Sequence, residues 1–327
     1  MTSSPAHPKS VMDMVFVVVV SVTSFLSVPS CVIIIAIHVK CRDLRTTGRS
    51  MLVQLSVADL LTAVGNLMGV LWFLFRDSEV LNRSRAYCDT HSSLTIFSSI
   101  ASFFWTTVTA LSLFLVLVRH THNTVHTHWK PIWLLCWGVP TIITAAALGF
   151  EVLGYDPKIT QASWCWIDPK TPHQPVWNFM TGKAWELLAY FLTIVFYTAV
   201  RISLLRHKAI SDNVLSHRPR RDGIRDANIK LMFVPLVFIV LRLWGTVRFL
   251  LGLVDYTAAN SPYAAWIAPL QGFGDTAQGF CNFVMDVIFS PQFRRRLFCR
   301  TSDPPATSSS SNCRTTSIST VSGQHEC

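Results

Sequence analysis

Residues 11–37 decide the fold class: they read VMDMVFVVVVSVTSFLSVPSCVIIIAI and carry a single charged side chain, Asp13. A helix needs about 20 predominantly apolar residues to cross the hydrocarbon core of a bilayer. Pro29 lies inside this run, which membrane helices tolerate. The run exceeds the apolar stretch of about 7–15 residues in a signal peptide, and a basic loop follows it instead of a cleavage site. It therefore predicts an uncleaved transmembrane helix.

Similar apolar runs recur along the chain of 327 residues. We expect seven transmembrane helices, at residues 11–37, 51–75, 92–118, 131–153, 184–205, 231–254 and 266–289. The composition agrees, with 50 % hydrophobic and 14 % charged residues and a mean hydropathy of +0.39. Disordered chains are polar and rich in charge, so this class is excluded. Soluble proteins carry about 25 % charged residues, so a soluble enzyme is disfavoured. The predicted fold class is all-α, a seven-transmembrane helix bundle spanning residues 11–289.

The positions of Lys and Arg predict the orientation of this bundle. With the N-terminus outside, the inner loops and the tail hold 18 of the 28 basic residues, and the outer segments hold 7. Cytoplasmic loops are enriched in Lys and Arg, so residues 1–10 form a short extracellular N-terminus and the C-terminus is cytoplasmic. The same loops account for the net charge of +10, and nucleic acid is not an expected partner.

The orientation also sorts the nine cysteines. Only Cys88 and Cys165 face the oxidising side of the membrane, where disulfides persist. We expect a bridge between them that pins the long loop between the fourth and fifth helices over the mouth of the bundle. Asn82, in Asn82-Arg83-Ser84, belongs to the only N-x-[ST] sequon and also lies outside, which makes it a candidate glycosylation site close to the membrane.

Residues 290–300 (SPQFRRRLFCR) predict an amphipathic juxtamembrane helix on the inner leaflet, in contact with membrane lipid. Cys299 is a palmitoylation candidate, because a cysteine on such a helix is a usual site. Residues 301–327 are rich in Ser and Thr and predict a disordered cytoplasmic tail. Phosphorylation of this tail by receptor kinases would add negative charge and recruit arrestin, so both are expected partners.

Three stretches carry a family resemblance: QLSVADLLTA (54–63), Trp164-Cys165-Trp166 and KLMFVPLVFIVLRLWGTVRFLLG (230–252). Together with the seven helices, they resemble the G-protein-coupled receptor 157-like orphan receptors, which are related to amoebal cyclic-AMP receptors and to secretin-like receptors. The resemblance implies a receptor of unassigned extracellular ligand that signals to heterotrimeric G proteins, with a leaning to Gq and phospholipase C. It also implies a multi-pass protein of the plasma membrane, including the ciliary membrane.

The chain departs from the large rhodopsin-like class at its activation motifs. The third helix ends LFLVLVRHTHN (113–123) without an Asp-Arg-Tyr triplet, and CNFVMDVIFSPQF (281–293) lacks Asn-Pro-x-x-Tyr. The rhodopsin-like mechanism is therefore not carried over. Asp59, in LSVADLL (55–61), matches the membrane acid that binds sodium in that class. The partners of a sodium site are missing, which favours a hydrogen-bonded structural acid over sodium.

Ionisable side chains inside membrane helices are costly and should face the bundle and find partners. Arg242 lies near the middle of the sixth helix, and Asp275 lies about ten residues, or about 15 Å, into the seventh. Their similar depth predicts an intramembrane ion pair, which serves either packing or signalling. Three further side chains are candidates for lining a ligand pocket: His91, Glu186 and Arg248.

Basic side chains of the predicted inner loops are candidates for contact with the G protein: Arg119, His120, Arg220 and Arg221. His122 and His126 have the i, i+4 spacing of two zinc ligands, but no Cys or carboxylate is near enough in sequence to complete the site. A basic loop that touches headgroups or a G protein is the favoured interpretation, and neither a metal nor a cofactor is expected.

Two other classes of seven-helix protein remain as alternatives. A membrane transporter usually shows repeated halves, and this chain has no such symmetry. An intramembrane enzyme needs several metal ligands on its helices, and only His91 is a plausible intramembrane histidine. A third class, the seven-helix retinal proteins, is excluded because they need a Lys in the seventh helix and residues 265–289 contain none. We therefore predict a receptor without enzymatic activity.

Overall fold

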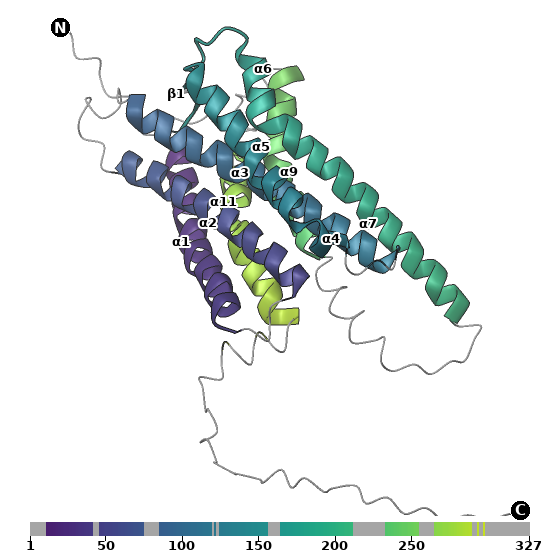
Figure 1. The fold of residues 1–327 in the computed structure, drawn as a ribbon. Helices are drawn as coiled ribbons and strands as arrows, with labels where there is room; N and C mark the ends of the chain where they lie inside the picture. The colour runs from purple at the N-terminus through teal and green to yellow at the C-terminus, as the bar shows by residue number, and fades with distance from the viewer. Residues whose placement is uncertain are drawn as a thin grey trace, which may run out of the picture.

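The computed structural model describes residues 11–41, 46–74, 85–119, 121, 124–155, 164–211, 233–254, 265–289, 293 and 297. Within them the chain forms long helices that run lengthwise beside one another (Figure 1). These are α1 (Val11–Lys40), α2 (Thr47–Leu74), α3 (Arg85–Leu117), α5 (Trp129–Gly149), α7 (Ala184–Ser211), α9 (Phe233–Val254) and α11 (Ile267–Phe289). The all-α bundle of seven long helices agrees with the predicted fold class.

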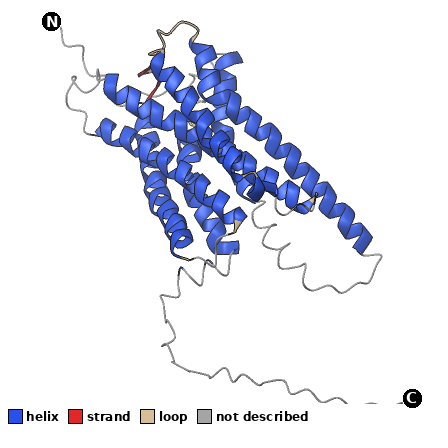
Figure 2. Ribbon diagram, in the orientation of Figure 1, coloured by secondary structure: helices blue, strands red, loops and turns tan. Residues whose placement is uncertain are grey.

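Shorter elements complete the described chain, which is helical almost throughout (Figure 2). One helical turn, α4 (Thr124–Thr127), precedes α5, and α6 (Gln174–Asn178) and the π-helical segment η3 (Phe179–Lys183) precede α7. Two strands, β1 (Leu153–Tyr155) and β2 (Cys165–Ile167), form an antiparallel hairpin. Gly154 pairs with Trp166 at the centre of this hairpin.

Six of the described helices are long and apolar enough to cross a membrane: Val11–Lys40, Thr47–Leu74, Arg85–Leu117, Trp129–Gly149, Gln174–Arg206 and Phe233–Val254. The seventh long helix, α11, has 23 residues and spans about 34 Å at 1.5 Å per residue. It is less apolar because polar side chains such as Gln278 and Asn282 occupy its buried face. Their burial against α1, α2 and α9 places α11 inside the same bundle.

Helix α3 lies at the centre of the bundle, where it contacts α2, α5, α7 and α9. Apolar side chains on the outside of the bundle stay exposed, for example Phe25 at 70 %, Ile142 at 70 % and Phe191 at 64 %. A water-soluble protein rarely exposes so much apolar surface, whereas a membrane protein presents it to lipid. The side-chain burial therefore agrees with a bundle surrounded by lipid.

The two ends of the bundle are distinguished by contacts between distant segments. Phe16, early in α1, packs against Trp164 beside the hairpin, with ring centroids 6.0 Å apart. At the other end Arg49, early in α2, lies 3.6 Å from Asp286, late in α11. The chain thus enters the bundle at the hairpin end and leaves α11 at the opposite end, as an odd number of crossings requires. Following the predicted topology, we call the hairpin end the outer end.

A disulfide joins Cys88 at the start of α3 to Cys165 in β2, with Cα atoms 5.1 Å apart. This is the predicted bridge. It fixes β2 to the outer end of α3, where Leu153 and Ile167 of the hairpin pack into an apolar cluster with Ile96 and Ile100.

The helix boundaries differ from the predicted ones mainly before α7. The apolar run predicts a helix at 184–205, but the helical chain extends from Gln174 to Ser211 through α6, η3 and α7. Lys183, which directly precedes the predicted helix, therefore lies inside the observed one and is only 7 % exposed. The apolar run underestimates the helix because residues 174–183 (QPVWNFMTGK) mix polar side chains, Pro and Gly with apolar ones and so form no continuous apolar stretch.

Helices α9 and α11 approach closely at Gly274. A Cβ atom at this position would overlap the carbonyl oxygen of Leu241 in α9. Only a glycine permits this backbone contact, which brings the polar side chains of the two helices within reach of one another.

Several sequence predictions lie outside the described residues: glycosylation at Asn82, the contacts of His120, Arg220 and Arg221, and palmitoylation at Cys299. The same holds for residues 1–10 and 301–327 and for most of the juxtamembrane helix at 290–300. Phe293 and Leu297 of that segment are described, and Phe293 is buried against Phe283 of α11 with Arg49 over its ring.

Candidate functional site

The π-helical segment η3 brings two charged side chains into the bundle. The wide turn at Phe179–Lys183 buries Thr181 and Lys183, and Glu186 follows one turn later. Lys183 Nζ donates to Glu186 Oε2 over 2.7 Å, and the two side chains are 9 % and 5 % exposed. Burying two charges is tolerable only when they pair and their remaining valences are hydrogen-bonded. Single π-turns within helices occur frequently at functional sites.

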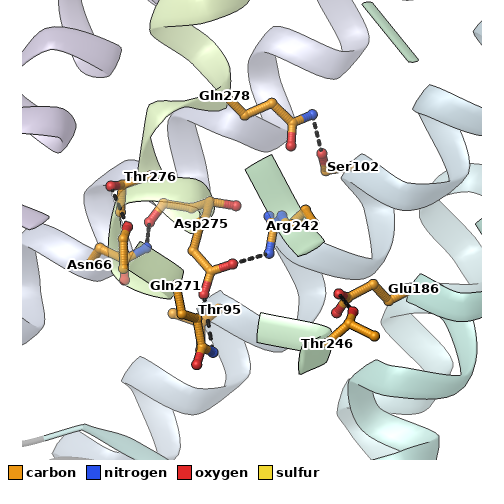
Figure 3. A network of polar contacts seen from close by, with 12 residues as sticks. Asn66, Thr95, Ser102, Glu186, Arg242, Thr246, Gln271, Asp275, Thr276 and Gln278 are labelled. Atoms are coloured by element: carbon orange, nitrogen blue, oxygen red, sulfur yellow. Dashed lines mark hydrogen bonds and ion pairs between the residues drawn. The ribbon is translucent and has the colours of Figure 1, made fainter. Parts of the chain in front are cut away.

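Glu186 also connects α7 to α9. Its Oε1 atom accepts a hydrogen bond of 2.6 Å from Thr246 of α9 and one of 2.9 Å from Tyr190 of α7. The Glu186–Thr246 contact is visible at the lower right of Figure 3. Both oxygens of this carboxylate are therefore occupied by donors of the protein itself.

Arg242 and Asp275 form the second charge pair, between α9 and α11. Arg242 Nη1 donates to Asp275 Oδ1 over 2.9 Å, and the side chains are 5 % and 17 % exposed (Figure 3). The guanidinium carbon lies 5.1 Å from the centre of the Phe103 ring of α3, at the distance of a cation–π contact. The contact predicted from helix depth is thus present, and its role in signalling stays a prediction.

The Arg242 guanidinium is only partly satisfied. Its Nε and Nη2 atoms are buried and have no hydrogen-bond partner among the described residues. A buried donor left unsatisfied typically costs about 1–3 kcal/mol. A side chain held in such a position marks a site where a further acceptor would be stabilising.

Gln271 of α11 links the Arg242–Asp275 pair to a third cation, Arg248. Arg248 Nη1 donates to Gln271 Oε1 over 3.4 Å, and Gln271 Nε2 donates to Asp275 Oδ2 over 3.5 Å. A Cβ atom on Gly245 would lie 3.3 Å from both Lys183 Nζ and Gln271 Cγ, so η3, α9 and α11 converge there. We call this group the outer polar core: Lys183, Glu186, Tyr190, Arg242, Thr246, Arg248, Gln271 and Asp275.

The three predicted pocket residues divide between two places. Glu186 and Arg248 both belong to the outer polar core. Glu186 pairs with Lys183, and Arg248 donates to Gln271. His91 belongs to a separate aromatic cluster, where it is fully buried between the rings of Tyr87 and Trp164. The structure therefore does not bring His91 to the other two, because α3 turns this side chain toward α2 and the hairpin.

Asp59 is the centre of a second, deeper polar group. Its two oxygens accept hydrogen bonds of 3.0 Å each from Ser102 of α3 and Asn282 of α11, and it is 4 % exposed. Gln278 donates to the Ser102 hydroxyl over 3.1 Å (Figure 3). Neutral donors hold this carboxyl group, which supports the interpretation of a hydrogen-bonded structural acid.

The sequence missed Lys183, Tyr190, Thr246 and Gln271 as members of the outer polar core. Lys183 and Glu186 have the i, i+3 spacing of a helical ion pair, which would have indicated the contact once the helix was extended. The uncharged members give no such signal. Among the described residues, no group of three His, Cys, Asp or Glu side chains lies close enough to hold a metal ion.

Comparisons with known proteins agree with this architecture. The family described as 7 transmembrane receptor (Secretin family) matches residues 13–274. G-protein coupled receptor 157 of Mus musculus is 36 % identical over 90 % of this chain and 88 % of its own length. Cyclic AMP receptor-like protein A of Dictyostelium discoideum is 24 % identical over 79 % of this chain and 63 % of its own. The crystal structure of squid rhodopsin shares the fold, with a TM-score of 0.68 at 14 % identity over 91 % of this chain and 89 % of that one.

Proposed function

Because the chain belongs to the secretin-type family of seven-transmembrane receptors, we propose that it carries an extracellular signal to heterotrimeric G proteins of the Gq type. The family and the relatives are G-protein-coupled receptors and not enzymes, so this chain is a multi-pass membrane receptor. The preference for Gq, the plasma and ciliary membranes, and arrestin and receptor kinases as partners belong to the proposal. The juxtamembrane helix, the Ser/Thr-rich tail, and modification at Asn82 and Cys299 belong to it as well.

The observation that carries the proposal is the outer polar core, which connects α9 to one helix by a hydrogen bond and to another by an ion pair. Thr246 holds α9 to Glu186 of α7, and Arg242 holds it to Asp275 of α11. A ligand that changes either contact from the outer end changes the position of α9. Since α9 is one rigid helix of 22 residues, the displacement reaches its inner end at Phe233.

The test is nucleotide exchange on purified G proteins. The full chain, reconstituted in lipid nanodiscs, is mixed in turn with Gq, Gs, Gi and G12 heterotrimers, and binding of a non-hydrolysable GTP analogue is measured. We expect exchange above that of empty nanodiscs, with the largest stimulation for Gq. Stimulation of another class would refute the Gq preference alone. A transporter or an enzyme would stimulate none of the four.

A further inference from the structure

Donors and acceptors in the outer polar core are not balanced. Both Glu186 oxygens accept hydrogen bonds from the protein, and both Asp275 oxygens do so as well. The surplus is on the donor side: Arg242 keeps Nε and Nη2 buried without a partner in the described part of the chain. Lys183 has three N–H bonds, one of which reaches Glu186. The core therefore lacks acceptors.

The two cations with donors to spare come from different helical elements that meet near Gly245. Lys183 reaches from η3 to Gly245 on α9, and Arg242 lies one turn earlier on that helix, against Asp275 (Figure 3). Both are more than nine-tenths buried. Charge-assisted hydrogen bonds from buried Arg and Lys to an oxyanion are short and strong, and the planar guanidinium presents two parallel N–H groups to carboxylate or phosphate oxygens.

We propose that the outer polar core binds an oxyanion, a carboxylate or a phosphodiester, through Arg242 and Lys183. This rests on the proposed function, because it names the chemical class of the ligand that acts at that site. The anion competes with Glu186 and Asp275 for the two cations. Its binding therefore loosens the links from α9 to α7 and α11 that hold the unliganded arrangement.

Thermal unfolding of the full chain in zwitterionic nanodiscs tests the proposal without a G protein. The probes are sodium propionate and sodium dimethyl phosphate, each compared with sodium chloride at equal ionic strength and with methylammonium chloride as a cation. A ligand that binds only the folded state raises Tm, by about 3 °C at ten times its Kd. A third arm uses nanodiscs that contain phosphatidylglycerol, so a shift only there assigns the phosphodiester to a lipid headgroup.

Substitutions give the sharper result. Lys183→Gln and Arg242→Gln should each weaken probe binding at least tenfold, and Arg242→Lys should retain part of it. Glu186→Gln removes a competing carboxylate, so it should strengthen anion binding, whereas a cation site would be weakened by the same change. The controls are Lys130→Gln and Arg201→Gln, which replace exposed cations of α5 and α7.

The proposal is refuted if neither anion shifts Tm more than chloride does, if only methylammonium does, or if Glu186→Gln weakens the anion shift. An arginine variant that does not fold leaves the decision to Lys183→Gln and Glu186→Gln. Failure here with intact G-protein activation overturns the ligand class only. Anion binding without activation of any G protein overturns the proposed function only.

Discussion

Removing either member of the Arg242–Asp275 pair should destabilise the protein, and the loss of Asp275 should cost more free energy than the loss of Arg242. Asp275→Ala leaves the guanidinium of Arg242 buried at 5 % exposure beside the Phe103 ring, without its hydrogen-bonded carboxylate. Arginine cannot become neutral in a protein. Removing one partner of a buried pair typically costs about 3–5 kcal/mol, and we expect this variant to lie in that range.

Arg242→Ala should cost less, about 2–3 kcal/mol. Asp275 is 17 % exposed, it keeps the long hydrogen bond from Gln271 at 3.5 Å, and a carboxyl group can bind a proton and become neutral. The double variant to Ala should cost less than the sum of the two single variants by about 2–3 kcal/mol, because no charge is then left unpaired. The exchange Arg242→Asp with Asp275→Arg should recover part of the loss.

The assay is unfolding of the four variants in identical nanodiscs, followed by fluorescence, together with their unstimulated nucleotide exchange. Arg201→Ala, which removes an exposed arginine of α7, is the matched control and should change stability by less than about 0.5 kcal/mol. If the two single effects add within about 0.5 kcal/mol and the exchange rescues nothing, the two residues do not stabilise one another and the reasoning is wrong. If the unstimulated nucleotide exchange of these variants changes in parallel with their loss of pair stability, the pair has a role in signalling.

Three further predictions concern other parts of the chain. Cys88→Ala and Cys165→Ala should each cost about 2–5 kcal/mol and reduce delivery to the cell surface, measured by surface labelling; free thiols at both positions in mature protein would contradict the bridge. Gly274→Val should prevent the close approach of α9 and α11 and destabilise the bundle by more than about 2 kcal/mol, whereas Gly252→Ala, whose added methyl group meets no atom within 4 Å, should be tolerated. Truncation after Cys299 should abolish arrestin recruitment after activation, and unchanged recruitment would show that the tail has no regulatory role.

The sequence determined where the apolar runs lie and which side of the membrane each connection faces. The thickness of the hydrocarbon core sets a minimum length for each apolar run, so the helices from 11–37 to 266–289 could be located by length alone. Depth also predicted the contact between Arg242 and Asp275, since two costly charges at one level on adjacent helices have few other partners. The side of the membrane, read from Lys and Arg, selected Cys88 and Cys165 as the bridge.

Tertiary structure alone decided how each helix is rotated about its axis and where its pitch changes. The π-turn at Phe179–Lys183 adds a residue to the turn and directs Lys183 inward, which no hydropathy pattern records because hydropathy reports length and not rotation. Rotation likewise separates His91 from Glu186. It depends on the packing of many distant side chains against one another, and the close contact at Gly274 fixes it for α9 and α11. The membrane determines how long a helix must be to cross it, whereas the neighbouring helices determine how the helix is rotated and which side chains face the bundle.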